Sequence, residues 1–477
     1  MSVSKKCFFV EKSGVNIGGI LFYHKKRIVK MKITLIPTIP PAAAKDLPTA
    51  TPELLASVLA KYSRSNLGIE KIFEGVDKTN PDASVEKIFK FIDYGHASIG
   101  GLTGGIAIAV DDCSMFLAYK IFEIAQLVDG QESSTRYIKM SPESLMSADE
   151  IGIPKDLQDE WQSVMSESFE IYNREYQKLD EIATKHPEKL RISPEENEKF
   201  RQRILKNYAL DRCRSFIPFA TRTSAAYIMT ARVWAATLKE LSSIPLQEAQ
   251  TAANQIREQL AKIAPNLIRH SFADEASKYH AEKLLDFSTQ QILKNGVETA
   301  NIPDEVFVEL SSSTPNFLPK TETTDSAFSQ KTNRYSIVGS DIKRQFVRFA
   351  FNNISIAELR DLNRHRSGNR FTPLSPVGFY LAGDLQHSDY SDFFAKYSNL
   401  LKKLAKHNLQ YYGYLLGTQV AFEHSTHLDK TIYEIELRTG KGAHFRYAEH
   451  LQKVAEKLIE ISPELKPHIQ IGTAEPE

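Results

Sequence analysis

One stretch of the chain, residues 344–370, places a strand pattern directly before a helix pattern. Apolar side chains alternate with other residues at Val347, Phe349 and Phe351, which indicates a strand with one buried face. We interpret the Asn-Asn pair that follows as a turn. Ser355, with a glutamate three positions later, has the signature of a capping box, so we predict that a helix begins there and runs into the sequence Arg-His-Arg.

The same pattern occurs earlier in the chain. Residues 106–125 (IAIAVDDCSMFLAYKIFEIA) align without a gap with residues 347–366 (VRFAFNNISIAELRDLNRHR), and Ser114 then corresponds to Ser355. In both regions a later helix is predicted to close on a similar tripeptide, Ile-Ala-Pro in the first and Ile-Ser-Pro in the second. We infer two tandem copies of one domain that have diverged in sequence.

The remaining pattern divides the chain into four regions. A strand is predicted to begin at Met31, followed by helices at about 51–62 and about 85–94. The charged stretch at about 156–206 has helical periodicity, and we interpret it as a surface insertion in the first copy. The predicted regions are an N-terminal extension at 1–30, a first domain at 31–285, a linker with the first strand (VFVEL) of the second copy at 286–340, and a second domain at 341–477.

Composition narrows the class of protein. The 477 residues are 42% hydrophobic and 25% charged, as in an ordinary globular protein with room for two or three domains. The net charge of +1 argues against a dedicated nucleic-acid or membrane-surface binder, which would need a global positive field. The three cysteines fit neither a zinc site nor a disulfide framework, and no apolar run reaches about 18 residues. We therefore expect no metal, no membrane contact and a cytoplasmic location.

A short loop after the first strand and helix has the residue types of an anion site. It reads QESSTRY at 131–137, with a carboxylate at Glu132, two serine hydroxyls and the guanidinium of Arg136. These groups provide the acceptor, the donors and the planar clamp that a phosphorylated nucleoside needs. A helix cap with a surface arginine is the alternative interpretation of this loop.

Further arginines occur in segments that otherwise read as buried. Arg212 and Arg214 precede a proline, and Arg222 and Arg232 follow in what we interpret as a helix of low charge. Buried arginines need partners, which can be a bound anion or an acidic side chain. The Arg-His-Arg cluster at 364–366 leaves a similar choice. It is either a site for two anionic groups, because its side chains would point to different faces of a helix, or a solvated helix end.

The order of these motifs resembles one enzyme family, the flavin-dependent thymidylate synthases. A strand, a helix, Arg-His-Arg, a loop with Glu-x-Ser-x-Arg-Tyr, then Arg-x-x-x-Pro and a last helix that ends in arginine follow one another in that family. The resemblance covers about residues 55–268 and 341–465. It implies an α+β fold, here two copies of an antiparallel-type sheet flanked by long helices that form a pseudo-dimer. It also implies methylation of dUMP to dTMP, with methylene-tetrahydrofolate as the carbon donor and FAD reduced by NADPH.

The resemblance implies roles for particular residues and divides them between the copies. The first copy keeps the nucleotide loop but has lost the arginine cluster, whereas the second keeps the cluster and has lost the loop. The implied nucleotide-binding residues are Glu132, Ser134, Arg136, Tyr137, Arg214, Arg364 and Arg438. The implied flavin-binding residues are Ser63, His96, Ser98, Arg232, Arg364, His365 and Arg366, and the implied catalytic residues are Ser134, Arg364 and Arg438.

This division predicts a composite site. In the family, four identical subunits build each site from several chains, and the nucleotide loop of one subunit faces the Arg-His-Arg helix of another. A fused pseudo-dimer tolerates the loss of opposite halves of the site in its two copies, because one complete site remains. The resemblance therefore implies one composite site for each chain and a homodimer that forms a pseudo-tetramer.

The chemistry implied by the resemblance is electrostatic. Arg136 and Arg214 are expected to clamp the phosphate, while Arg364 and Arg438 stabilise the negative charge that develops on the uracil. Ser134 is expected to donate a hydrogen bond, since no base suited to activate a serine is evident beside it.

Two departures from the family pattern leave other functions open. Asp361 stands where the family has a neutral amide near the nucleotide, and Gly101 replaces a glutamate close to the flavin. A related one-carbon reaction, such as hydroxymethylation of a pyrimidine nucleotide, is therefore an alternative. A nucleotide- or flavin-binding protein without turnover is a second alternative, from a different functional class.

Overall fold

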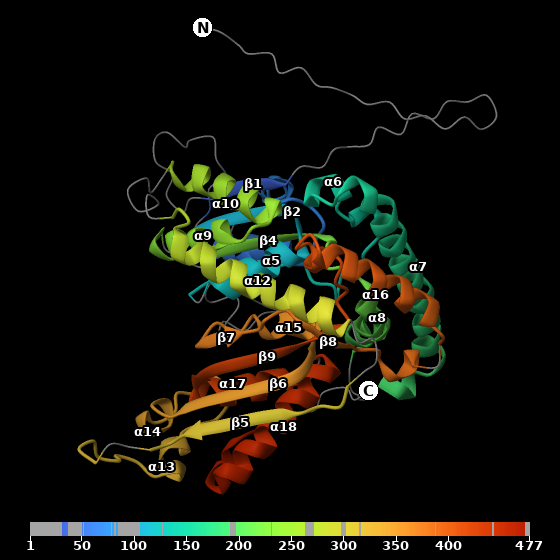
Figure 1. The fold of residues 1–477 in the computed structure, drawn as a ribbon. Helices are drawn as coiled ribbons and strands as arrows, with labels where there is room; N and C mark the ends of the chain where they lie inside the picture. The colour runs from blue at the N-terminus through green and yellow to red at the C-terminus, as the bar shows by residue number, and fades with distance from the viewer. Residues whose placement is uncertain are drawn as a thin grey trace, which may run out of the picture.

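Two antiparallel sheets with helices packed around them make up the computed structural model of this protein (Figure 1). This mixed helix and sheet architecture confirms the predicted α+β class. The structure describes residues 31–36, 50, 52–77, 79–80, 83, 105–125, 127–190, 197–229, 231–262, 271–296, 302–313, 316–386, 388–440 and 443–472. The N-terminal extension at 1–30 and the helix predicted at 85–94 lie outside these residues.

The first sheet has four strands in the order β1-β2-β4-β3 and is covered on both faces. The elements of this half are β1 Lys32–Ile36, α1 Pro52–Tyr62, α2 Ile69–Glu74, β2 Ile106–Ser114, α5 Met115–Ile124, β3 Asp129–Glu132, α6 Ala148–Ile151, α7 Lys155–Lys185, α8 Glu198–Cys213, β4 Arg222–Met229, α9 Ala231–Ser243, α10 Gln247–Leu260 and α12 Glu275–Asn295. Ala107 and Ala109 of β2 pack with α1 and α2, whereas the alternate residues Ile108 and Val110 join the core formed with α5, α9 and α10.

The second sheet has five strands, with β5-β6-β9-β7 in order and β8 paired with β9. The elements of this half are β5 Val306–Ser311, α13 Thr324–Phe328, α14 Ser340–Lys343, β6 Phe346–Ser355, α15 Ile356–Leu362, β7 Asn369–Phe371, β8 Pro376–Phe379, α16 Ser391–Ala405, β9 Thr418–His427, α17 Leu428–Arg438 and α18 Phe445–Ile461. Strand β5 pairs antiparallel with β6 and confirms the strand predicted from VFVEL. Helices α17 and α18 pack on this sheet.

The two sheets are built alike around their second strands. β2 and β6 each lead directly into a helix, and each has a register shift near its end, between Val110 and Cys113 in β2 and between Phe351 and Ile354 in β6. The predicted turn at Asn352-Asn353 is wrong, because β6 bends at this shift and then resumes its pairing with β9. The likeness agrees with the repeat in the sequence, and the tandem duplication itself stays a prediction.

The two halves share one hydrophobic core, and main-chain hydrogen bonds cross the junction between them. The N–H of Phe219 donates to the carbonyl of Tyr414 at 2.7 Å, and the N–H of Leu416 donates to that of Ile217 at 2.9 Å. The predicted domain boundary at 285 falls inside α12. The halves are therefore joined by packing and hydrogen bonds as well as by the chain.

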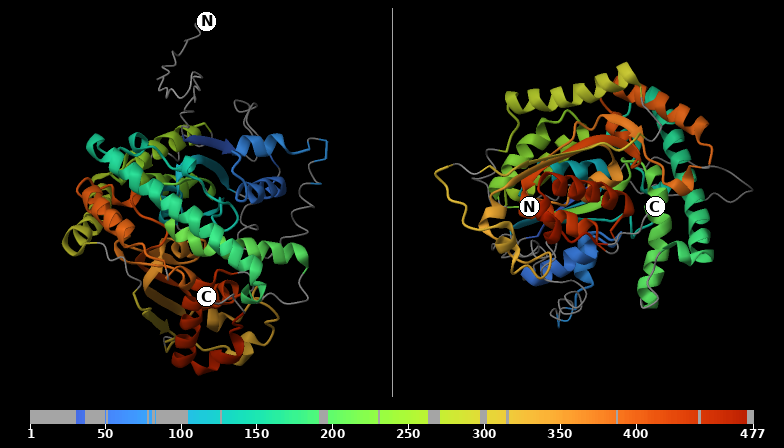
Figure 2. Two further views of the ribbon diagram at one scale, coloured as in Figure 1. Left: turned by 90° about the vertical axis from the view of Figure 1, so that its right-hand side faces the viewer. Right: turned by 90° about the horizontal axis from the view of Figure 1, so that it is seen from below.

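The insertion predicted at 156–206 corresponds largely to α7 and α8, which run side by side along one flank of the molecule (Figure 2). Helix α7 is more than a surface element. Trp161 on its inner face is fully buried, and the indole N–H donates to the carbonyl of Tyr412 at 3.2 Å. On its outer face, Glu167 forms an exposed ion pair with Lys396 of α16 at 3.0 Å. The insertion thus helps to hold the two halves together.

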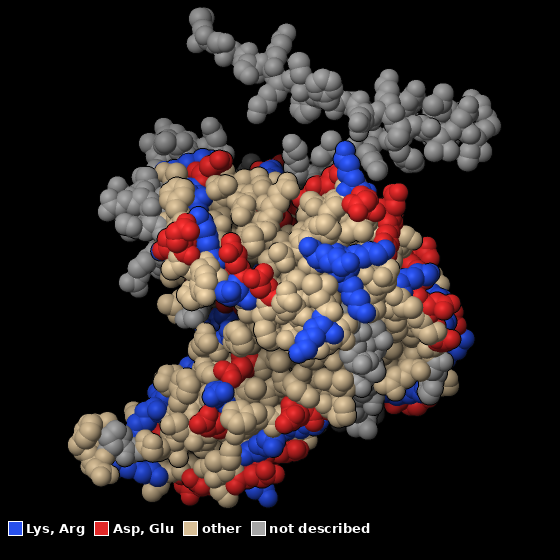
Figure 3. Space-filling model, viewed as in Figure 1, with Lys and Arg blue, Asp and Glu red and all other residues tan. Residues whose placement is uncertain are grey.

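The surface in Figure 3 carries basic and acidic side chains that are interspersed, with no broad field of one sign on the face shown. This distribution agrees with the small net charge of the chain. None of the described helices is long and apolar enough to cross a membrane. Any anion site must therefore be local, and the buried arginines at the junction of the halves are candidates for it.

The helix after each second strand is capped by a serine that bonds a buried carboxylate. In the second half, Glu358 accepts hydrogen bonds from the backbone N and the Oγ of Ser355, which confirms the predicted capping box, and lies 3.0 Å from Nδ1 of His450. In the first half the carboxylate comes from α10. Glu248 accepts from the backbone N of Ser114 at 2.8 Å, from its Oγ at 2.7 Å, and from a tyrosine hydroxyl of the second half.

The loss of charge at these two carboxylates, Glu358 and Glu248, should change the stability of the protein by different amounts. Burial alone would raise the pKa of Glu358, but the charge and hydrogen bond of His450, followed by the charge of Arg446, lower it from 4.5 to about 2. At Glu248 burial dominates and raises the pKa. Because the folded-state pKa of Glu358 is depressed, its contribution to the stability of the fold is complete above pH 4.5 and is lost as the pH falls towards 2.

We expect Glu358→Gln to lower the free energy of unfolding by about 3 kcal/mol at pH 7, and by less at pH 3. Glu248→Gln should lower it by less than about 1 kcal/mol. Urea unfolding at both pH values measures this, and equal losses in the two variants would contradict it.

Candidate active site

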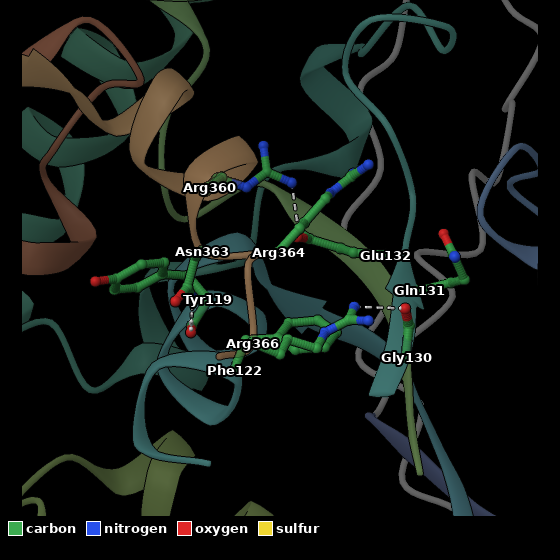
Figure 4. A pocket seen from close by; sticks show the side chains of 9 residues that line it. All are labelled: Tyr119, Phe122, Gly130, Gln131, Glu132, Arg360, Asn363, Arg364 and Arg366. Atoms are coloured by element: carbon green, nitrogen blue, oxygen red, sulfur yellow. Dashed lines mark hydrogen bonds and ion pairs between the residues drawn. The ribbon is translucent and has the colours of Figure 1, made fainter. Parts of the chain in front are cut away.

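Strand β3 of the first half and the segment around α15 of the second half lie against each other (Figure 4). Arg360 of α15 donates from Nη2 to the carboxylate of Glu132, and both side chains are buried. Arg366 donates to the carbonyl of Gly130 at 2.8 Å and to the carboxylate of Asp129 at 3.1 Å. The structure thus places the predicted loop of the first copy beside the predicted arginine cluster of the second, through Arg360 four positions before the cluster and Gly130 one position before the loop.

The arginine cluster lies just beyond the end of α15, so the prediction that the helix runs through it is wrong. The helix ends at Leu362, and Gly368, with a φ of +81°, turns the chain into β7. Arg370 holds this turn by donating to the carbonyl of His365 at 2.9 Å. A solvated helix end is excluded, because His365 is only 7% exposed and the side chain of Arg366 only 13%.

Buried His365 positions Arg438, the last residue of α17. Arg438 donates from Nε to Nε2 of His365 at 2.6 Å and from Nη2 to the carbonyl of Asp361 at 3.1 Å. Burial, followed by the charge of Arg438, holds the pKa of His365 well below its usual value. The imidazole is therefore neutral at physiological pH and accepts the hydrogen bond that orients the guanidinium.

The two arginines predicted to clamp a phosphate both lie in this interior, and each contacts a buried carboxylate. Arg136 donates to both oxygens of Asp211 on α8, with both distances 2.7 Å. Arg214 donates to Asp361 of α15 at 3.2 Å. Neither guanidinium is a free cation in this structure. The sequence left two partners open for these arginines, a bound anion or an acidic side chain, and in the structure the partner is an acidic side chain.

Arg364 differs from the other arginines of the site. Within the described part of the chain its side chain makes no hydrogen bond and no ion pair, and it is partly exposed. In Figure 4 its guanidinium extends away from α15 beside the contact between Arg360 and Glu132. It is a cation whose position suits contact with a ligand.

Two hollows meet at Arg364. The narrow cleft lies between β3 and the arginine segment, and its lining includes Gly130, Glu132, Arg364 and Arg366 (Figure 4). The wide groove, with a volume of about 660 Å³, is lined by residues within 328–343, 364–367 and 429–436 and by Asp129. Arg364 and Arg366 line both hollows. The narrow cleft, with a volume of about 10 Å³, has room for about one water molecule, so a larger ligand that contacts these two arginines would lie in the wide groove.

The remaining predicted site residues of the first half lie around the loop after β3. Ser63 is buried, and its carbonyl accepts from the N–H of Ser134 at 3.1 Å. The Oγ of Ser134 accepts from the N–H of Arg136 at 3.3 Å, and the ring of Tyr137 lies 5.8 Å below the guanidinium of Arg64. The structure gathers these residues beside the cleft. His96, Ser98 and Gly101 lie outside the described residues, and the side chain of Arg232 is not described.

Two arginines outside the cleft have acidic partners of their own. Arg222 was predicted to lie in a helix, but it begins strand β4, where it contacts Glu150 and donates to the carbonyl of Asp112 at 2.9 Å. This prediction was wrong because the low charge of the segment reflects a strand buried on both faces. Arg212 donates to Asp384 at 2.7 Å.

Several residues of the site were missed in the sequence. Asp129, Asp211 and Arg360 each bind a predicted residue, and Asp211 lies in the last turn of α8, three positions before Arg214. Acidic residues close to the predicted arginines are the signal that could have found Asp211. The described residues contain no group of three or more His, Cys, Asp or Glu placed to hold a metal ion.

Comparison with known proteins covers the first half of the chain. Residues 47–266 match the sequence profile described as thymidylate synthase complementing protein. None of the curated protein sequences matches the chain. A solved structure to which it is similar is that of a UMP/dUMP methylase, PolB from Streptomyces cacaoi, bound with 5-Br dUMP. The identity is 15%, the alignment covers 51% of this chain and 96% of that one, and the TM-score of 0.24 is too low to carry an argument. The profile match over residues 47–266 confirms the resemblance predicted from the motifs, here to the family described as thymidylate synthase complementing protein.

Proposed function

We propose that this protein methylates dUMP to dTMP in a flavin-dependent reaction, at a composite site between the two halves of the chain. Methylene-tetrahydrofolate is the proposed carbon donor, FAD the cofactor and NADPH its reductant, and the chain is proposed to act as a homodimer. One observation carries the proposal. Glu132 of the loop retained by the first half contacts Arg360 of α15, Arg366 of the retained arginine cluster contacts Gly130 directly before the loop, and both segments line one cleft. The family whose profile residues 47–266 match supports nucleotide methylation as the general reaction.

Unsatisfied arginine donors support an anionic ligand between the two halves. The Nε atoms of Arg214, Arg360 and Arg366 are buried and have no hydrogen-bond partner within the described residues. A buried donor without a partner costs free energy, and the oxygens of a phosphate or of a uracil ring would remove that cost. Arg364, which lines the narrow cleft, adds a guanidinium that makes no hydrogen bond or ion pair within the described residues. The chemistry of this donor set therefore suits a pyrimidine nucleotide.

The wide groove suits a flavin in size and in chemistry. Its volume of about 660 Å³ lies within the range of pockets that enclose cofactors. Tyr335 and Tyr433, whose ring centroids are 6.1 Å apart, offer aromatic surface, while Lys343 and Arg364 offer positive charge for a diphosphate. When bound, FAD supplies hydride-transfer chemistry that protein side chains lack.

In this proposal the side chains act through position and charge. Arg364 reaches both hollows, so it orients the nucleotide against the groove and stabilises negative charge that develops on the uracil. Arg438, held by His365, supplies a second fixed positive charge. Ser134 donates from its hydroxyl to the nucleotide. A preorganised donor of this kind contributes roughly 100- to 1,000-fold to the rate, which is why no covalent bond to the protein is required.

Asp361 favours a second candidate function. It stands where the flavin-dependent thymidylate synthases have a neutral amide, and its carboxylate lies 3.2 Å from Arg214. A nucleotide at this site would meet a negative charge that those enzymes do not have. A different one-carbon reaction on a pyrimidine nucleotide, with hydroxymethylation as the example, is therefore the second candidate.

Product analysis tests the proposed function. The purified protein is mixed with FAD and separated from unbound FAD, and its flavin absorbance is recorded before dUMP, methylene-tetrahydrofolate and NADPH are added. We expect a yellow protein that releases the C5 hydrogen of dUMP and forms dTMP. Release of this hydrogen with a hydroxymethylated product supports the second candidate. Yellow protein without release indicates binding without turnover, and protein that stays colourless contradicts both flavin-dependent functions.

A further inference from the structure

The two buried arginine–carboxylate pairs of the site, Arg136 with Asp211 and Arg214 with Asp361, differ in the number and length of their hydrogen bonds. Arg136 makes two hydrogen bonds to Asp211, both at 2.7 Å, the geometry of a tight bidentate pair. Arg214 makes one hydrogen bond to Asp361, at 3.2 Å, and its Nε has no partner within the described residues although the side chain is only 3% exposed. The first pair is complete, whereas the second leaves a buried guanidinium partly unsatisfied.

Asp361 is a charged group surrounded by cations. Its carboxyl would have a raised pKa from burial alone, but Arg214 first, and then Arg364, Arg136 and Arg438, hold the pKa of this carboxyl well below its usual value. A proton therefore does not neutralise it at physiological pH. Asp361 thus keeps a full negative charge in the buried interior between the halves, where Arg214 is its hydrogen-bond partner.

We propose that Asp361 is an internal anion that occupies Arg214 and competes with the phosphate of the nucleotide for it. This inference rests on the proposed function, because it concerns the phosphate group of that substrate. Nucleotide binding then requires the one hydrogen bond between Arg214 and Asp361 to break, while the bidentate pair of Arg136 and Asp211 stays in place. Arg214 becomes the receptor of the phosphate only when its own carboxylate has been displaced.

The charges determine the direction of the effect. A phosphate and the Asp361 carboxylate are both negative, and their repulsion is strong in a site shielded from water. Asn at position 361 keeps the size of the side chain and an oxygen that accepts from Arg214, but it removes the charge. We therefore expect Asp361→Asn to bind phosphate groups at least about tenfold more tightly than the wild-type protein.

Calorimetric titration of the full chain with inorganic phosphate, dUMP and deoxyuridine tests the inference. The Kd for phosphate and for dUMP should fall at least about tenfold in Asp361→Asn, whereas the Kd for deoxyuridine, which has no phosphate, should stay within about twofold. The double variant Asp361→Asn with Arg214→Ala should lose the gain. An unchanged or weaker affinity for phosphate in Asp361→Asn overturns the inference, and so does a gain that survives the loss of Arg214.

A matched control and an independent readout complete the test. Asp384→Asn removes a carboxylate from Arg212, a neighbouring arginine outside the cleft, and should leave phosphate affinity unchanged. Asp361→Gln, which also removes the charge, replaces Asp361→Asn if that variant fails to fold. Product analysis keeps the two proposals separate. A gain in phosphate affinity without dTMP formation supports this inference and contradicts the proposed function, while dTMP formation without the gain does the reverse.

Discussion

Arg364→Ala is expected to reduce nucleotide-dependent flavin oxidation by at least about 100-fold while the fold is kept. The side chain lines both hollows and makes no hydrogen bond or ion pair within the described residues, so its removal mainly takes a charge from the ligands, with the loss of one positive charge near Asp361. The free energy of unfolding should therefore fall by no more than about 1 kcal/mol. Stopped-flow absorbance of the reduced flavin, with and without dUMP, measures the loss, and urea unfolding measures the stability.

Arg348→Ala is the matched control for this prediction. Arg348 is also a partly exposed arginine of the second half, but its side chain lies on β6 beside Glu309 and Glu423, outside both hollows. Its replacement should leave flavin oxidation within about twofold of wild type. If Arg364→Ala retains wild-type oxidation rates, the two hollows are not the reaction site.

Features of the site that depend only on residues close together in the sequence could be predicted. Ser355 and Glu358 lie three positions apart, and their capping box forms as predicted because it needs only one turn of helix. The end of that helix was missed. Arg370 and Gly368, in the turn that follows, fix where the chain leaves α15, and their effect depends on contacts with β9 and with the first half of the chain.

The partners of the arginines could not be predicted, because they come from distant parts of the sequence. Arg214 meets Asp361 across 147 positions, and Glu132 meets Arg360 across 228. The sequence indicated that buried arginines need an anion and left open which one. Only the packing of the two halves decides that most of these arginines meet a carboxylate while Arg364 has no partner within the described residues.

In the predicted duplication, the first copy has Glu123, Ile124 and Ala125 in place of the arginine cluster and Leu241 in place of Arg438. Leu241, at the position that corresponds to Arg438, is fully buried in the core. At and next to the positions of the cluster, the carbonyl oxygens of Ala125 and Phe122 accept hydrogen bonds from Arg370 of the second half. Glu123 keeps a charge that is paired with Lys120, whereas Leu241 packs in the shared core. The same packing holds the retained loop against the retained arginines.

The contact between Glu132 and Arg360 is the closest link across the site, and its disruption should have a large effect on stability. Both side chains are only 6% exposed, so Glu132→Ala leaves a buried guanidinium without its counterion. We expect the free energy of unfolding to fall by about 3–5 kcal/mol, because the remaining charge has lost both its partner and its solvent. Urea or thermal unfolding of the full chain measures the loss.

Two further variants determine whether burial is the cause. Glu132→Leu combined with Arg360→Leu removes both charges together, and it should recover stability to within about 1–2 kcal/mol of wild type, because an apolar pair replaces a desolvated ion pair at little net cost. Glu167→Ala breaks an ion pair with Lys396 that also joins the two halves, but that pair is exposed and should contribute less than about 1 kcal/mol. If Glu132→Ala costs no more than Glu167→Ala, the loop and the arginine segment do not form a buried contact. The composite site would then lose the observation on which it rests.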